Sequence, residues 1–284
     1  MPNADPRVAI PDGQRQYHID LGPGDLAEYI LLPGDPDRTE RIATRLDRVD
    51  LSRRHREFAS VTGSYRGRRV SIVSTGIGAD NMEIAIAEIL AITQRPTFVR
   101  VGSCGVLQAD IELGDLVISS GAVRLEATTA FFVSDGYPAV ADYTAVAALV
   151  EAAARLGHRA HVGITATAPG FFGAQGRPIP QLPIRFPDLA ADLGRQRVLN
   201  FEMEASALLV LAGLAGCRAG VVCAAYAQRT TGRFVQEAAR AQAEAACIET
   251  GLEALCILAD MEDATRAAEA AHWRPSLWTP MVVS

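Results

Sequence analysis

The sequence predicts an α/β protein with a single domain built around one central sheet. Apolar segments of strand length alternate with helix-length segments along most of the chain. At 284 residues and 49% hydrophobic composition, the chain is long enough to bury a sizeable core. A stretch rich in Pro and Gly at residues 168–187 interrupts the alternation, but it lies inside the pattern. We therefore interpret it as a long loop rather than a domain boundary.

The first part of the chain is expected to form five strands and two helices. The helices are predicted at 37–46, where Asp37 would act as the N-cap, and at 81–93. Apolar runs bounded by Gly, Pro or polar residues predict the strands at 28–32, 60–65, 69–75, 97–102 and 116–123.

The second part continues the same alternation. Strands are expected at 161–167, 198–203 and 218–227, and helices at 143–156, 204–215 and 236–261. We predict a loose N-terminal arm at 1–17, the domain itself at 18–261, and a C-terminal tail at 262–284. The two Trp residues of the tail indicate that part of it docks on the domain.

Composition excludes several classes of function. The net charge of -6 provides no general basic face for nucleic acid. The chain contains no Lys, which excludes a Schiff-base lysine, a P-loop lysine and a pyridoxal anchor. Any bound anion must then be held by Arg side chains and backbone N–H groups.

Cysteine use and hydropathy indicate a cytoplasmic protein without a membrane partner. The five Cys residues show no CxxC spacing, which favours a reducing compartment. The N-terminus lacks the apolar segment of a signal peptide, and no apolar run reaches the roughly 20 residues that span a bilayer.

Two carboxylates flank a methionine in an otherwise apolar stretch. Glu202, Met203 and Glu204 are followed by the apolar run 205–210. An unpartnered buried carboxylate is costly, so such residues need a specific partner. Carboxylate oxygens could accept from sugar hydroxyls while the thioether packs under the ring. Glu202 could equally be a catalytic acid or a structural partner for an Arg.

Two glycine-containing loops predict an anion site. Residues 32–38 follow one expected strand and open a helix, and they carry Gly34 and Arg38. Residues 100–105 end another expected strand and carry Arg100 and Ser103. Either loop alone could simply form a turn with its Arg paired to a surface acid. Together they favour a phosphate site, because ligands of open α/β sheets collect at the carboxyl ends of strands.

In its motifs the chain resembles the nucleoside phosphorylase-I superfamily, and within it the uridine phosphorylases. The similarity runs from residue 18 to about residue 229, and its motifs keep their order and spacing. They are PGDPDR (33–38), HREF (55–58), STGIG (74–78), RVGSCG (100–105), FFGAQGR (171–177) and EMEAS (202–206).

This resemblance implies a mixed, distorted central sheet flanked by helices. It also implies a homohexamer arranged as a trimer of dimers, with active sites shared across each dimer. The implied reaction is phosphorolysis of a pyrimidine nucleoside, either uridine or a close analogue (5′-modified uridines included), to free base and (deoxy)ribose 1-phosphate. Nucleoside and phosphate would be the only partners besides other copies of the chain. No metal or organic cofactor is implied.

The resemblance also assigns roles to individual residues. Catalytic roles would fall to Arg100, Arg177 and Glu204. Phosphate would be bound by Gly34, Arg38, Arg100 and Ser103, together with Arg56 from the neighbouring subunit. The ribose would be bound by Met203, Glu204 and the neighbour's own copy of His18. The base would be bound by Phe171, Gln175, Arg177, Tyr226 and Arg229.

Features of the base site favour a pyrimidine. Gln175 offers both a donor and an acceptor to the imide face of uracil, and Arg177 can donate to the charge that develops on the leaving base. Purine-specific relatives use an acid near the strand that ends at Arg229, and residues 223–229 contain none. Tyr226 stands where an aliphatic residue is usual, so it could narrow the pocket or add a hydroxyl contact.

Alternatives remain open on sequence alone. They are a purine nucleoside phosphorylase, a hydrolytic nucleosidase and a non-catalytic nucleoside-binding protein. We interpret Cys104 as a packing residue, and the His158/His161 pair as structural rather than metal-binding. The region of Glu57 and Asn81 resembles a monovalent-cation site in some relatives, but Asn81 replaces a Ser there, and we predict no ion.

Overall fold

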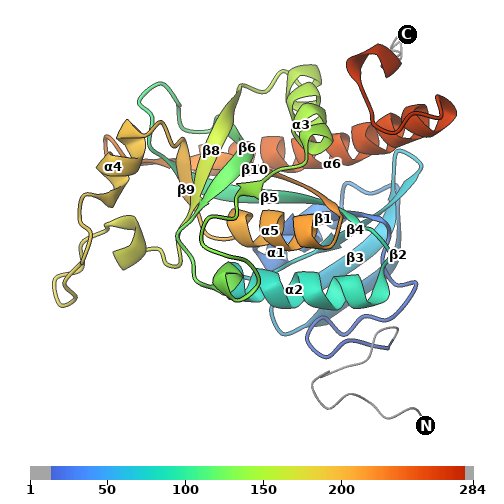
Figure 1. Cartoon of the computed structure of the whole chain (residues 1–284), viewed down its shortest axis with the longest axis horizontal. Coiled ribbons are helices and arrows are strands. Elements are labelled where there is room, and N and C mark those ends of the chain that lie inside the picture. Colours follow the sequence, from blue (N-terminus) through green and yellow to red (C-terminus); the bar gives the residue numbers. More distant parts are fainter. Residues whose placement is uncertain (1–13, 279–284) are drawn as a thin grey trace.

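A computed structural model describes residues 14–278 and places one mixed β-sheet at the centre of the molecule (Figure 1). Residues 1–13 of the expected arm (1–17) and residues 279–284 of the expected tail (262–284) lie outside the described residues. The strands are β1 (Tyr29–Pro33), β2 (Arg48–His55), β3 (Phe58–Tyr65), β4 (Arg68–Val73), β5 (Thr97–Val106), β6 (Leu116–Arg124), β7 (Ala139–Val140), β8 (Ala160–Thr167), β9 (Asn200–Glu202), β10 (Arg218–Gln228) and β11 (Arg233–Phe234).

The sheet closes partly on itself, which confirms the expected mixed and distorted architecture. The strands β10, β6, β8, β9 and β5 pair in that order, and β5 pairs with β10 again, so the five form a ring. The remaining strands extend from β5 through β1, β4 and β3 to β2 at the edge. Parallel pairs such as β1–β5 and antiparallel pairs such as β5–β9 occur in the same sheet.

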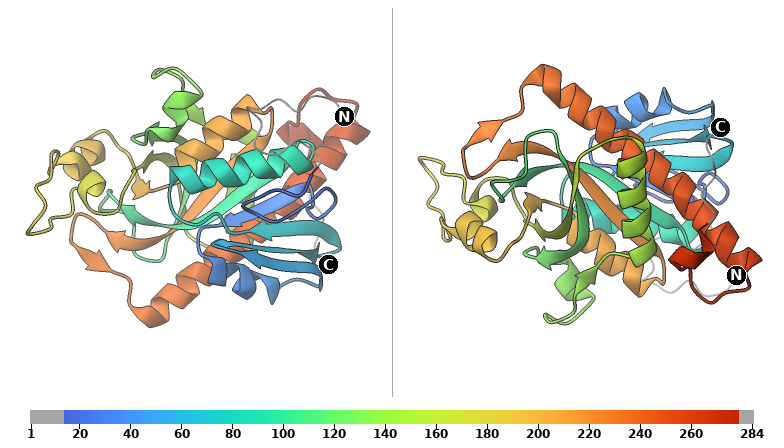
Figure 2. Two further views of the ribbon diagram at one scale, coloured as in Figure 1. Left: turned by 90° about the horizontal axis from the view of Figure 1, so that it is seen from below. Right: turned by 90° about the horizontal axis from the view of Figure 1, so that it is seen from above.

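Helices cover both faces of the sheet. They are α1 (Pro36–Ala43), α2 (Ala79–Ile92), α3 (Tyr143–Arg155), α4 (Leu189–Arg195), α5 (Ala205–Leu214) and α6 (Glu237–Ala267). Figure 2 shows α2 beside α5 when the molecule is seen from below, and α3 lying across the long α6 when it is seen from above. None of the helices in residues 14–278 is long and apolar enough to cross a membrane.

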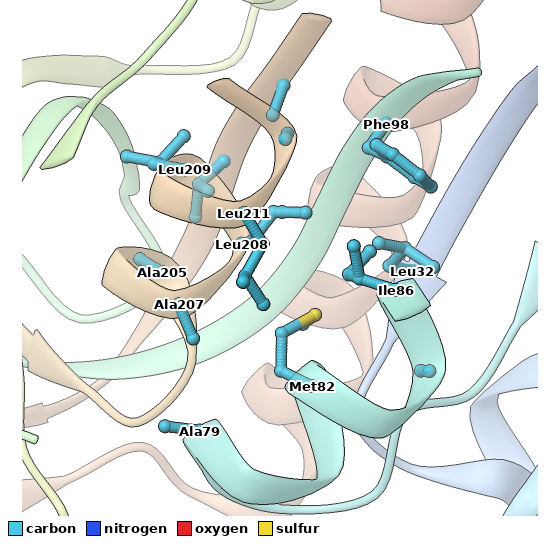
Figure 3. Close-up of a cluster of buried hydrophobic side chains, with 14 of the residues drawn as sticks. Leu32, Ala79, Met82, Ile86, Phe98, Ala205, Ala207, Leu208, Leu209 and Leu211 are labelled. Atoms are coloured by element: carbon cyan, nitrogen blue, oxygen red, sulfur yellow. The ribbon is translucent and has the colours of Figure 1, made fainter. Parts of the chain in front are cut away.

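Two large hydrophobic cores, besides a smaller cluster around Phe201, hold these layers together. In the first, Met82 and Ile86 of α2 face Leu208 of α5 and Phe98 of β5 (Figure 3). The second core joins α3 and α6 to the opposite face of the sheet and includes Val99 and Val101. Because strand side chains alternate between faces, Phe98 and Val99 of β5 belong to different cores. Burial of large side chains in both layers supplies the main driving force for this arrangement.

Several element boundaries differ from expectation. Asp35, not Asp37, is the N-cap of α1, because its side chain accepts from the Asp37 N–H and Pro36 occupies the first turn. Residues 102–105 are not a loop but continue β5 to Val106, since β10 and β9 pair with them. The helix α6 extends to Ala267, six residues beyond its predicted end.

Some elements had no sequence signal that we recognised. These are β2, β7, β11, α4 and the short 3-10 turns η1 (Thr128–Phe131), η2 (Gly173–Gln175) and η3 (Pro275–Leu277). At the N-terminal side Gln16 is buried, so packing begins before residue 18. Trp273 and Trp278 pack against the core of α3 and α6, which confirms that this part of the tail docks.

Candidate active site

One cleft of about 780 Å³ collects most of the predicted site residues. Parallel pairing of β1 with β5 sets Leu32 beside Arg100 and Pro33 beside Val101. The turn that follows β1 is therefore held next to residues 102–103 of β5. The predicted residues that line the cleft are Gly34, Arg38, Arg100, Ser103, Phe171, Gln175, Arg177, Met203, Glu204 and Tyr226.

The cleft runs along β5, so successive residues of this strand lie toward its two different ends. A Cβ added at Gly102 would lie 3.1 Å from Arg100 Nη2, whereas one added at Gly105 would lie 3.7 Å from Arg177 Nη2. The two glycines are three positions apart in the strand, or roughly 10 Å. One guanidinium thus lies beside each glycine, toward opposite ends of the cleft.

Arg38 and Gly34 shape the first end. The Arg38 side chain is almost buried, and it donates from Nε to Glu244 Oε2 (3.1 Å) and from Nη1 to the Val101 carbonyl (3.2 Å). A Cβ on Gly34 would lie 3.1 Å from the Gly76 carbonyl and 3.7 Å from Arg100 Nη1. A side chain at this turn would therefore crowd the Gly76 carbonyl and the space beside Arg100.

Arg100 lies between the two predicted carboxylates. It donates from Nε to Glu202 Oε2 (3.4 Å) and from Nη2 to Glu204 Oε2. Burial opposes its charge, but the attraction of Glu204 and Glu202 outweighs that cost and raises the pKa of Arg100. Its Nη1 is buried without a hydrogen-bond partner among residues 14–278, so one donor remains available to a ligand.

The two carboxylates differ in their surroundings. Glu202 accepts from the backbone N–H groups of Glu204 and Ala205 (2.8 Å each) and from Thr167 Oγ1 (2.6 Å). Burial raises the pKa of Glu202, and the Arg100 guanidinium opposes that rise. With these contacts Glu202 is a partner of Arg100 and fixes the turn before α5. Glu204 accepts from the Gly78 N–H (2.6 Å) and from Arg100, and it lines the cleft.

The second end is aromatic and cationic. The guanidinium carbon of Arg177 lies 4.3 Å from the centroid of Phe171 and 5.4 Å from that of Phe234. Arg177 Nε is buried and has no hydrogen-bond partner within the described part of the chain. Burial lowers the pKa of Arg177.

Arg229 contacts Gln175 at this end of the cleft. It donates to the side-chain oxygen of Gln175 at 3.4 Å and to the Gln175 carbonyl at 2.7 Å, and Gln175 is itself buried. Burial, together with nearby Arg177, lowers the pKa of Arg229 to about 10. Arg229 is not among the described residues that line the cleft, and it holds Gln175, which does line it.

His18 and Arg56 lie outside this cleft, side by side on another part of the same chain. His18 Nδ1 lies 2.6 Å from Glu88 Oε1, and the His18 carbonyl lies 2.8 Å from His55 Nδ1. Arg56 donates to the hydroxyl of exposed Tyr17 at 3.0 Å. Neither residue is among those that line the cleft of its own chain within residues 14–278.

The other candidate groups have structural surroundings. Cys104 is buried, and burial raises the pKa of its thiol well above the ordinary value. His161 faces Asp115 (2.9 Å) whereas His158 faces Glu249 (3.7 Å), so the two imidazoles have different partners. Within residues 14–278, no three His, Cys, Asp or Glu side chains are grouped to hold a metal.

Two further residues that line the cleft, Ile77 and Phe234, were not predicted from the sequence. Phe234 is an exposed aromatic residue in the two-residue strand β11, and it stacks near Arg177. Ile77 is 72% exposed between two glycines, an unusual place for a large aliphatic side chain. Glu57 and Asn81 also line the cleft and contact each other at 3.3 Å.

Comparison with known proteins gives a consistent result. Residues 28–265 match the family described as the phosphorylase superfamily. The chain is 46% identical to a uridine phosphorylase of Thermococcus kodakarensis over 92% of this chain and 93% of that protein. It is 37% identical to a guanosine phosphorylase of Halorubrum lacusprofundi over 74% and 82%. The crystal structure of uridine phosphorylase from Vibrio fischeri superposes with a TM-score of 0.77 at 28% identity, covering 86% of this chain and 98% of that one.

Proposed function

The chain belongs to the phosphorylase superfamily, and we propose that it catalyses the phosphorolysis of uridine or a close pyrimidine nucleoside. The products are the free base and ribose 1-phosphate. The family match agrees with the resemblance carried by the motifs. Nucleoside and phosphate are therefore the substrates.

The observation that carries the proposal is the placement of two unpartnered donors in one cleft. Arg100 Nη1 lies near one end, and Arg177 Nε near the other, both buried and without a partner among the described residues. Glu204 lies in the same cleft. Among the described residues that carry such a buried side-chain atom, only Arg100 and Arg177 line the cleft, and a donor without a partner requires an acceptor. Two anionic acceptors, one at each end, match an attacking phosphate and a departing base.

At the first end, Arg38 and Arg100 bind phosphate with Ser103 and the turn at Gly34. A phosphate oxygen attacks C1′ as the bond from C1′ to the base nitrogen breaks, and its electron pair leaves with the base. Positive charge grows on the sugar, so the bound dianion also stabilises the transition state. Glu204 accepts from the ribose hydroxyls while Met203 packs against the ring.

At the second end, Arg177 and Gln175 receive the base. The leaving uracil carries negative charge spread over its ring and carbonyl oxygens. Donors already in place stabilise that charge without reorganising during the reaction. Among the described residues, this end is lined by Phe171, Gln175, Arg177 and Phe234 and carries no carboxylic acid that could protonate a purine, which supports a pyrimidine substrate.

The position of His18 and Arg56 supports an assembly in which active sites are shared. These residues lie together outside their own cleft, and they complete the cleft of a neighbouring copy, where they reach the 5′-hydroxyl and the phosphate. The proposed assembly is a homohexamer formed as a trimer of dimers. The proposed location is the cytoplasm, in keeping with the unpaired cysteines.

A phosphate-dependence assay tests the function. The purified protein is incubated with uridine, thymidine, 5′-modified uridines and inosine, with and without inorganic phosphate. Release of uracil that requires phosphate and produces ribose 1-phosphate is the expected result. Release of uracil at the same rate with and without phosphate would indicate a hydrolase. Inosine outcompeting uridine would indicate a purine phosphorylase, the activity named for the Halorubrum relative. Binding without turnover would indicate a nucleoside-binding protein.

A further inference from the structure

Glu244 of α6 connects the phosphate end of the cleft to a distant part of the chain. Its Oε2 accepts from Arg38 Nε at 3.1 Å, and its Oε1 accepts from Arg41 Nε at 2.6 Å. The Tyr226 hydroxyl, on the wall of the cleft, lies 3.5 Å from the same Oε2. Burial raises the pKa of Tyr226 to about 12, so the phenol remains protonated and can donate. Glu244 is absent from the cleft lining in the described part of the chain.

The contact fixes the orientation of Arg38. A guanidinium is planar, so two hydrogen bonds on different nitrogens determine where the third nitrogen points. Arg38 uses Nε for Glu244 and Nη1 for the Val101 carbonyl. Its Nη2 has no hydrogen bond to residues 14–278 and belongs to a side chain that lines the cleft. This is the atom that can reach an anion.

Glu244 is tied to the phosphate turn by a second route. Arg41 donates from Nη2 to Asp35 Oδ2 at 2.8 Å while its Nε is bound to Glu244. Asp35 follows Gly34 directly and caps α1. The Glu244 carboxylate therefore holds two parts of the phosphate end. It holds the Arg38 guanidinium directly, and it holds the helix cap Asp35 through Arg41.

We propose that Glu244 is a positioning residue for phosphate, which acts by holding Arg38 with Nη2 directed into the cleft. This inference rests on the proposed function and extends it to a residue outside the cleft. Glu244 does not touch either substrate. Its removal should therefore weaken phosphate binding selectively and leave nucleoside binding almost unchanged.

A purely electrostatic role makes the opposite prediction. Glu244 partly neutralises Arg38, so removing its charge would make the cleft more positive and tighten phosphate binding. The orientation effect and the charge effect thus have opposite signs. Glu244→Gln removes the charge and keeps one acceptor oxygen for Arg38, whereas Glu244→Ala removes both. Comparison of the two variants separates the effects.

A matched control is available on the same helix. Glu249 of α6 pairs with Arg45, which also ties α6 to the segment after α1, but it lies outside the described lining of the cleft. Glu249→Ala removes a similar carboxylate and a similar ion pair. Thermal unfolding of each variant verifies that it is folded before kinetics are measured.

The steady-state KM for phosphate and for uridine is measured for each variant. Loss of a hydrogen bond between charged groups should raise the phosphate KM of Glu244→Ala about tenfold. Glu244→Gln should show a smaller rise, and Glu249→Ala should match the unmodified protein. The KM for uridine should stay close to that of the unmodified protein in every variant. An equal rise for uridine, an effect no larger than that of Glu249→Ala, or a lower phosphate KM would overturn the proposal.

Two further measurements keep the test decisive. If Glu244→Ala does not fold, Glu244→Asp retains the charge but withdraws the carboxylate from Arg38, and it should show the same selective loss. Titration calorimetry with inorganic phosphate alone measures binding without turnover. If the unmodified protein lacks phosphate-dependent uracil release, the proposed function fails. Weaker phosphate binding by Glu244→Ala would still support the role of Glu244, and unchanged binding would refute it.

Discussion

Arg100 donates a hydrogen bond to Glu204, so the residue proposed to bind phosphate is paired with the residue proposed to bind the ribose diol. Arg100 Nη2 and Glu204 Oε2 are the atoms in contact, and both side chains are buried. A buried ion pair is stable only while each charge has a partner. We expect an anion bound to Arg100 Nη1 to draw the guanidinium toward itself and free a Glu204 oxygen for the sugar.

This pairing predicts that the two substrates help each other bind. Sulfate, a tetrahedral dianion that does not react, should tighten uridine binding by about five- to tenfold, a typical coupling between sites. By linkage, uridine should tighten sulfate binding by the same factor. Titration calorimetry measures both affinities, with chloride at equal ionic strength as the control for screening. Identical uridine affinity in sulfate and chloride would mean that Arg100 and Glu204 do not couple the subsites.

Glu204→Gln should impair ribosides more than 2′-deoxyribosides. The carboxylate is proposed to accept from both sugar hydroxyls, and one of these contacts is missing in a deoxyriboside. We expect kcat/KM for uridine to fall at least about tenfold, the loss for one charge-assisted hydrogen bond, and to fall less for 2′-deoxyuridine. Steady-state kinetics on the two substrates provides the comparison. Equal losses would show that Glu204 does not contact the 2′-hydroxyl.

Local features of the cleft could be predicted from the sequence because they reside in short motifs. The turn at Gly34 and the Arg100 segment are each continuous, and parallel strands bring their ends together. Glu202 was one predicted partner for an Arg, and it contacts Arg100, but the partner of Arg38 could not be predicted. Glu244 lies 206 residues from Arg38 in sequence, so only the packing of α6 brings the two together.

The errors in secondary structure also have physical causes. The strand β2 lies at the edge of the sheet and is largely exposed, so it lacks the alternating apolar pattern of a half-buried strand. The glycines of β5 resemble a loop in sequence, yet pairing with β10 and β9 keeps them in the sheet. Pro36 at the first turn of α1 was the signal that Asp35 is the cap.

Arg177→Met should reduce kcat by about 10²–10³, the typical cost of losing one donor to developing negative charge. The KM for phosphate should change little, because Arg177 lies at the other end of the cleft. Arg185→Met is the matched control, since Arg185 also lies over an aromatic ring, at 4.8 Å from Phe186, but outside the described lining of the cleft. A kcat for Arg177→Met close to that of Arg185→Met would show that Arg177 does not take part in the reaction.

Gly34→Ala should weaken the use of phosphate. The added Cβ would lie 3.1 Å from the Gly76 carbonyl and would fill the approach to Arg100 Nη1. We expect the phosphate KM to rise about tenfold or more, with a smaller effect on uridine. Gly136→Ala serves as the control, because a Cβ there meets nothing within 4 Å. An unchanged phosphate KM in Gly34→Ala would show that phosphate does not approach this turn.

The contribution of Glu244 to stability should depend on pH in the acid range. Burial opposes ionisation, but hydrogen bonds from Arg41 and Arg38 outweigh it and hold the pKa of Glu244 below the ordinary value of 4.5. A carboxyl whose pKa is lower in the folded state stabilises the protein fully above its unfolded pKa and loses that effect as pH falls through the folded pKa. The difference in free energy of unfolding between the unmodified protein and Glu244→Gln should therefore be constant near neutral pH. It should shrink below about pH 4.5, as denaturant titrations at several pH values would reveal. A difference that persists unchanged at the acid end would show that the ionised form of Glu244 is not what Arg38 and Arg41 bind.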